Sequence, residues 1–159
     1  MIYFAFVYPL LWRGIEIYAN TTINHLTTLI TLNNKLLRIS QQKATRTHNA
    51  ELYRTYKTLP IQLLHKYQIL IFMQKYVYHR SKLPSAFSTY FEENKLIHDY
   101  NTRQKDDFHI HTVQCEKGKR SIKIKGCKLW NNLPAEIKMI QSSSSFKYKL
   151  KNYFLQCLD

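Results

Sequence analysis

The fold of this chain is decided by residues 60–79, which read PIQLLHKYQILIFMQKYVYH. Pro60 suits the first turn of an α-helix, because the backbone N–H groups of that turn have no partner within the helix. In residues 61–78, twelve of eighteen side chains are apolar, so little of the helix surface is suited to solvent. We therefore expect a helix that runs to about His79 and is the most buried element of the chain. Four polar residues argue against a membrane span: Gln62, Lys66, Gln68 and Lys75.

Upstream of this segment, apolar residues at spacings of three and four predict two further helices. Thr21 or Thr22 can cap the first of them, and its Asn, Thr, Lys and Arg residues are expected to face water. The second is short and covers residues 49–58, where it brings together Leu52, Tyr53 and Tyr56. The apolar stripe of the first helix is expected to consist of Ile23, Leu26, Leu29, Leu32, Leu36 and Ile39.

The beginning of the chain is dense in β-branched and aromatic residues. For residues 2–18 we predict a helix interrupted at Pro9, with a strand as the competing interpretation. The segment lacks the basic region and the small-residue cleavage site of a signal peptide, and it is too short to span a bilayer. A chain that begins so abruptly with apolar residues is expected to come from a longer protein.

Downstream of Pro84 the sequence becomes polar and less periodic, apart from a short predicted helix at residues 86–93. Residues 108–113 alternate between apolar and polar types, and residues 121–125 do so again. With a turn at Gly118, they predict a two-stranded β-ribbon. Two helices then close the chain. Pro134 can open the first, and Ser145 can cap the second, whose apolar stripe is Phe146, Leu150 and Phe154.

These elements predict a mainly α protein. We expect a helical bundle over residues 1–82, followed by a smaller mixed lobe over residues 83–159 with the β-ribbon and short helices. The length of 159 residues allows one ordinary domain with a core, and 45% hydrophobic with 21% charged residues is typical of a globular chain. Only three glycines and four prolines occur, which favours long helices with short connections.

The formal net charge of +14 is concentrated near the C-terminus. Residues 117–159 carry ten basic and two acidic residues, whereas residues 61–116 carry seven and six. Such a charge attracts nucleic acid, and the binding it produces weakens as salt rises. A solubilising surface, or a face that meets an acidic partner domain, is the alternative. No feature of the sequence specifies a membrane as a partner.

The basic cluster of residues 117–128 is the best candidate for a nucleic-acid site. On an extended segment, Lys123 and Lys125 would point to one side and Ile122 and Ile124 to the other. A row of ammonium groups follows phosphates and reads no bases, although lysines also protect solvated edge strands. The cluster contains Lys117, Lys119, Arg120, Lys123, Lys125 and Lys128.

Two further residues have competing interpretations. Trp130 could stack on an exposed base, but between Leu129 and Leu133 it is expected to anchor a short helix onto the core. Arg103 could bind a phosphate with two hydrogen bonds or hold a buried carboxylate, and the sequence does not separate these roles.

Other chemistry finds little support. His109, His111, Cys115 and Cys127 do not have a spacing common in zinc sites, so no metal site is predicted. No local pattern marks an activated nucleophile, and three isolated glycines form no phosphate-binding loop. The three cysteines lack the spacing of a disulfide scaffold, which suits a reducing compartment.

Five stretches of the chain form an ordered set at characteristic distances. They read YPLLWRGIEIY at residues 8–18, YNTR at 100–103, GKRSIKIKG at 118–126, KLWNNLP at 128–134 and SFKYKLKNY at 145–153. In this order they resemble the region after the palm and the C-terminal tail of jockey-type reverse transcriptases from non-LTR (non-long-terminal-repeat) retrotransposons. The family usually has Tyr-Pro followed by Tyr-Gly-Ile, and this chain departs slightly because Trp12-Arg13 stands around that position.

The resemblance implies that residues 1–82 correspond to the end of a polymerase thumb and residues 83–159 to the tail. In that family the palm lies upstream and binds Mg²⁺ through an aromatic residue, any residue, then Asp-Asp. The pair Asp106-Asp107 follows Gln104-Lys105, so it does not match and is expected to form a solvated turn. The chain itself is therefore expected to hold no cofactor and to catalyse no polymerisation.

The expected function is that of a C-terminal fragment of an RNA-directed DNA polymerase that contributes sequence-independent binding. Its expected partners are RNA, DNA or an RNA–DNA hybrid, together with the upstream palm, and no membrane. The family implies a nuclear or cytoplasmic location rather than secretion. The alternative is a structural docking module, or a degenerate retrotransposon relic without activity of its own.

Overall fold

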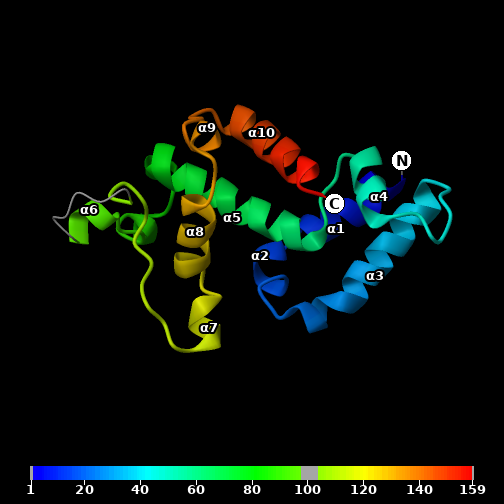
Figure 1. The fold of residues 1–159 in the computed structure, drawn as a ribbon, viewed down its shortest axis with the longest axis horizontal. Coiled ribbons are helices and arrows are strands. Elements are labelled where there is room, and N and C mark those ends of the chain that lie inside the picture. Colours follow the sequence, from blue (N-terminus) through cyan, green and yellow to red (C-terminus); the bar gives the residue numbers. More distant parts are fainter. Residues whose placement is uncertain (1, 98–103, 159) are drawn as a thin grey trace. The chain divides into compact units, whose positions relative to one another are not determined.

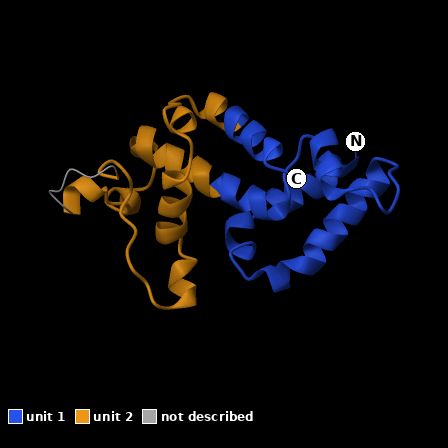
Figure 2. Ribbon diagram, in the orientation of Figure 1, with its two compact units in different colours: residues 1–68, 148–159 blue, residues 69–147 orange. Residues whose placement is uncertain are grey.

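The computed structural model describes residues 2–97 and 104–158, and these ranges are mainly helical (Figure 1). The predicted mainly α class is thus confirmed. The predicted β-ribbon is not found, because the described residues form no strand and only one isolated antiparallel bridge, between Glu93 and Phe108. The chain forms two compact units (Figure 2): unit 1 comprises residues 1–68 and 148–159, and unit 2 comprises residues 69–147. The division into a thumb-like bundle and a tail stays a prediction.

Among the described helices, α5 (Ile61–Tyr78) contains the most buried residues, as residues 60–79 predicted. Its first half belongs to unit 1 and its second half to unit 2. Two of its polar side chains are also buried, His65 and Gln74. Gln74 donates to the Gln141 carbonyl at 2.6 Å and accepts from the Ser143 hydroxyl at 3.1 Å, so its amide is satisfied where α10 (Ser143–Gln156) begins.

Unit 1 begins with a helix that changes type before its proline. The segment η1 (Tyr3–Val7) is a π-helix, and α1 (Tyr8–Trp12) continues it. Pro9 lies in the first turn of α1, where its missing N–H costs little. The helix therefore changes type next to Pro9 but is not broken there. The break comes at Gly14, whose φ of +73° is left-handed and separates α1 from α2 (Ile15–Tyr18).

The helix α3 (Ile23–Ser40) has the predicted bounds but a different orientation. Its buried residues are Leu26, Asn33, Asn34 and Leu37, and most of the expected apolar stripe faces solvent. The exposed fractions are 50% for Ile23, 53% for Leu32, 42% for Leu36 and 64% for Ile39.

A buried hydrogen-bond network explains this orientation. The Tyr3 hydroxyl donates to Asn33 Oδ1 at 3.0 Å, and Asn33 Nδ2 donates to the Tyr53 hydroxyl at 3.1 Å. That hydroxyl donates in turn to Asn34 Oδ1 at 2.6 Å. Buried amides and hydroxyls must find such partners, so the asparagines turn inward and rotate α3 with them.

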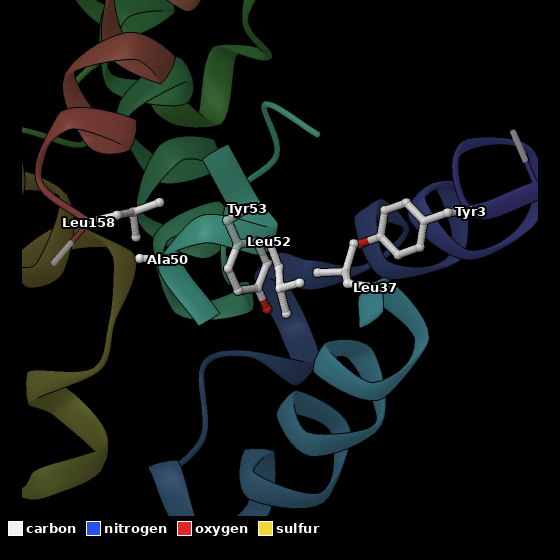
Figure 3. Close-up of a cluster of buried hydrophobic side chains, with 6 residues drawn as sticks. All are labelled: Tyr3, Leu37, Ala50, Leu52, Tyr53 and Leu158. Carbon is white, nitrogen blue, oxygen red and sulfur yellow. The ribbon is translucent and has the colours of Figure 1, made fainter. Parts of the chain in front are cut away.

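The network shares Tyr3 and Tyr53 with an apolar cluster of unit 1. Leu52 and Tyr53 of this cluster come from α4 (Asn49–Thr55). Leu158 lies beside Ala50, at the end of the cluster far from Tyr3 (Figure 3). Arg54 donates to the Leu158 carbonyl and fixes this end of the chain. The last helix also has its predicted stripe, since Phe146, Leu150 and Phe154 are all buried.

Unit 2 is centred on aromatic rings. Phe91 packs on Tyr76 with ring centroids 4.9 Å apart and on Phe108 at 5.7 Å. The predicted helix at residues 86–93 is replaced by two short 3₁₀ segments upstream, η2 (Arg80–Lys82) and η3 (Ser85–Phe87), and by α6 (Asn94–Ile97).

The segment expected to form the second ribbon strand is helical. It belongs to α8 (Ile122–Asn131), which follows α7 (Glu116–Lys119) and precedes α9 (Ala135–Lys138). The first ribbon segment pairs with Glu93 in the isolated bridge, and a side chain holds its other edge. Asn131 Oδ1 accepts from Phe108 N–H at 3.1 Å, and its Nδ2 donates to the Phe108 carbonyl at 2.8 Å. These are the two bonds that a paired strand would have supplied.

Candidate nucleic-acid interface

The basic cluster lies on two consecutive helices, α7 and α8, of unit 2 (Figure 1). The second of them is anchored by Ile124, Cys127 and Trp130, which are buried at spacings of three. Gly126 lets α8 approach α5 closely, because an added Cβ would lie 2.9 Å from Met73 Sδ. The basic side chains therefore stand on a helix with a packed face, which limits their range of positions.

The helical geometry changes which lysines share a side. Successive residues of a helix are rotated by about 100°, so Lys123 and Lys125 are about 200° apart. The expectation that they point together on a strand is thus wrong. Lys125 and Lys128 are three residues apart and lie on one side of α8. Lys128 is exposed, and Lys125 is half-buried.

Two of the cluster's cations already have carboxylate partners. Lys119 Nζ lies 2.6 Å from Glu116 Oε1 on the exposed surface of α7. The hydrogen bond and charge of Lys119 hold the pKa of the Glu116 carboxyl below its usual value, and the Arg120 charge adds to this effect. Lys123 Nζ lies 3.9 Å from Glu92 Oε1. Exposed pairs of this kind are weak, so a phosphate can compete for either lysine.

Lys117 and Lys128 are the most available members of the cluster. Both side chains are exposed, and neither forms an ion pair with another residue that the structure describes. Arg120 is half-buried at the junction of α7 and α8. Arg103 lies outside the described residues. The structure therefore places five of the seven predicted residues on these two helices and a sixth, Arg120, at the junction between them.

Trp130 has the structural role that was expected. It is 6% exposed, and its ring packs against Phe146 at a centroid distance of 6.0 Å. A side chain with so little exposed surface offers no face for a base to stack on. The candidate interface is therefore one of cations, without an aromatic platform from this residue.

The carboxylates Asp106 and Asp107 lie in a turn, as expected. Lys138 Nζ lies 3.5 Å from Asp107 Oδ1, so this carboxylate has a cationic partner within unit 2. Asp106 is exposed.

The histidines and cysteines considered for zinc do not converge. The rings of His109 and His111 meet edge to face at 4.8 Å, and His111 Nε2 lies 3.8 Å from Glu92 Oε2. Cys115 instead caps α7, where its Sγ accepts from the Gly118 N–H. Cys127 is buried in α8. Within residues 2–97 and 104–158, no three His, Cys, Asp or Glu side chains are grouped to hold a metal ion.

Two residues of the site were not identified from the sequence. Glu92 approaches both Lys123 and His111, although it is distant from them along the chain. Asn131 clamps Phe108 next to the cluster. No local pattern marks either residue, because each contact depends on the tertiary fold. The pairing of Glu116 with Lys119 could have been predicted, since residues three apart are neighbours on a helix.

No helix in the described part of the chain is long and apolar enough to cross a membrane. Comparison of the chain with protein-family models, with curated proteins and with solved structures gives no match.

Proposed function

We propose that this chain is the C-terminal region of a non-LTR retrotransposon reverse transcriptase and binds nucleic acid through its phosphates without reading base sequence. The helices α7 and α8, which carry the basic cluster, are called the α7–α8 platform below. The observation that carries the binding proposal is the exposed position of Lys117 and Lys128 on this platform. The similarity of five ordered stretches to the tail of that family supports the assignment to a parent polymerase. Its palm, with the Mg²⁺ that it binds, is proposed to lie in a part of the protein upstream of this region.

The charges favour a sequence-independent grip. Residues 117–159 carry ten basic residues against two acidic ones. Lysine is a flexible point charge that follows phosphate oxygens, whereas reading a base edge needs side chains that enter a groove. The proposed ligands are therefore RNA, DNA or an RNA–DNA hybrid, bound along the backbone. Such ligands occur in the nucleus and the cytoplasm, which is where we propose that the protein acts.

The test is a titration of the purified chain against a fluorescent RNA–DNA hybrid. The double variant Lys117→Gln/Lys128→Gln removes two exposed charges from the platform. We expect it to weaken binding about tenfold at low salt, which corresponds to about 1.4 kcal/mol. The matched control is Lys66→Gln/Lys75→Gln, which removes the same charge from exposed positions of α5.

The control should bind nearly as well as the unmodified chain. Equal weakening by both double variants would mean that only net charge matters, and the platform would lose its assigned role. Absence of hybrid binding by the folded, unmodified chain would refute the proposal as a whole.

A structural docking module, or a degenerate relic without independent activity, is the second candidate. The observation that favours docking is the number of large apolar side chains that unit 1 leaves in solvent. They include Ile2, Phe6, Leu10, Ile17, Leu32 and Ile39.

A further inference from the structure

Unit 1 contains an apolar surface groove of about 380 Å³. It is lined by the N-terminal helices and by α3. Tyr18 is the one lining residue with a polar side chain, and its hydroxyl donates to the Leu11 carbonyl within the fold. The lining residues are Val7, Leu10, Leu11, Tyr18, Leu29 and Leu36.

The helices that line this groove also carry exposed apolar side chains. On the N-terminal helices, Phe6 is 68% exposed and Leu10 71%, and their spacing of four places them on one face. On α3, Leu32 is 53% exposed and Ile39 is 64% exposed. Scattered apolar residues on a surface need no explanation, but a groove with apolar margins marks an interaction site.

The spacing on α3 fits a helical partner. Leu29, Leu32, Leu36 and Ile39 are separated by three, four and three residues, which is the repeat of a helix–helix seam. A groove with one wall of this kind accepts the apolar face of an amphipathic helix, whose own anchors recur at i, i+3, i+4 and i+7. The hydrogen-bond network holds Asn33 in the core. This orientation of α3 places the four-residue seam on the side that faces solvent.

The charge around the groove restricts the partner. Lys35 is exposed and lies between Leu32 and Ile39 on the same face of α3, since it is three and four residues from them. Arg13 is exposed at the end of α1, three residues after Leu10. Glu16, near the lining residue Tyr18, is the only acidic residue in residues 1–50, so these two cations outnumber it. A second copy of this chain would bring like charges together, whereas acidic flanks on a partner would be complementary.

We propose that this groove docks an amphipathic α-helix of another polypeptide, with apolar anchors on one face and Asp or Glu residues flanking them. The inference does not rest on nucleic-acid binding, because the groove lies in unit 1 and the basic platform lies in unit 2.

The experiment titrates the full chain into a fluorescein-labelled helical peptide with leucines at i, i+3, i+4 and i+7 and glutamates flanking them. A second peptide has lysines in place of the glutamates. The acidic peptide should bind at least tenfold more tightly. Leu10→Ser should weaken it at least tenfold, whereas the control Leu96→Ser, at a 74% exposed position of α6 in unit 2, should leave binding unchanged.

Lys35→Glu supplies an independent arm, because it should reduce the preference for the acidic peptide while leaving the apolar groove intact. Leu10 and Lys35 are both exposed, so circular dichroism should show folded variants. The proposal is overturned if the two peptides bind equally, or if Leu10→Ser has no effect. It is also overturned if neither peptide binds and Leu10→Ser instead abolishes self-association or adsorption to phosphatidylglycerol vesicles.

Discussion

Two asparagines organise unit 1 at the scale of single residues. Asn33 and Asn34 are 2% and 8% exposed and connect the hydroxyl groups of Tyr3 and Tyr53. Burial raises the pKa of both phenols, so they remain protonated hydrogen-bond donors to a higher pH than exposed tyrosines do. Each buried polar atom in this group depends on another one, which makes the group sensitive to loss of a single member.

Asn33→Leu should lower the free energy of unfolding of unit 1 by about 1–3 kcal/mol, because it leaves buried hydroxyls without partners. The control, Leu32→Asn, changes a 53% exposed neighbour and should alter stability by less than about 0.5 kcal/mol. Denaturant unfolding followed by Trp12 fluorescence in a Trp130→Phe background measures both. The opposite ranking of the two variants would show that the apolar stripe of α3, and not its asparagines, faces the core.

Cys127 should differ from the other two cysteines in reactivity. Burial raises the pKa of its thiol to about 11, whereas Cys115 and Cys157 are exposed. The reactive thiolate is therefore scarce at Cys127 near pH 8, and access is blocked. Iodoacetamide labelling followed by mass spectrometry should show two fast sites and one slow site.

The same pKa shift makes stability depend on pH. The folded state keeps the Cys127 proton to a higher pH than the unfolded state, so its contribution is present below pH 9 and is lost between pH 9 and about 11. In the iodoacetamide experiment, labelling of Cys127 at pH 8 as fast as that of Cys115 would contradict the burial of Cys127 on α8.

At the scale of elements, Gly14 determines how the N-terminal helices divide. Its φ is +73°, and an added Cβ would meet nothing within 4 Å. Gly14→Ala should therefore destabilise unit 1 by about 1 kcal/mol through the backbone alone. Gly14→Asn should cost less, because asparagine tolerates the left-handed region. Thermal unfolding of the two variants measures the difference, and equal stability of Gly14→Ala and the unmodified chain would argue against the left-handed turn.

The sequence predicted elements well where one strong pattern acted alone. The bounds of α3 and α5 and the stripe Phe146, Leu150 and Phe154 follow from apolar spacing. The orientation of α3 did not follow, because spacing alone assigns Asn33 to solvent and cannot anticipate Tyr3 and Tyr53 as its partners. The prediction of a β-ribbon was wrong for a related reason.

Residues 121–125 alternate over too short a length to distinguish a strand from a helix. The helical pattern becomes visible only when the residues that follow are included, because Ile124, Cys127 and Trp130 share a buried face. The composition of the candidate site was predictable from its run of basic residues. Its geometry was not, because Glu92 reaches Lys123 only through the tertiary fold.

At the scale of the whole molecule, charge and apolar exposure are distributed differently. The α7–α8 platform of unit 2 carries the basic cluster, and unit 1 carries the apolar groove. The proposed nucleic-acid site and the proposed peptide groove therefore belong to different units of the chain. The two activities should be separable by mutation: Leu10→Ser should leave hybrid binding intact, and Lys117→Gln/Lys128→Gln should leave peptide binding intact.

The most direct test of the central claim is the salt dependence of RNA–DNA hybrid binding. A grip on phosphates releases counterions, so the logarithm of the binding constant should fall linearly with the logarithm of salt concentration. In Lys117→Gln/Lys128→Gln the slope should become shallower by about one for each phosphate contact removed. A slope near zero for the unmodified chain, or the same slope in both proteins, would contradict phosphate binding by the α7–α8 platform.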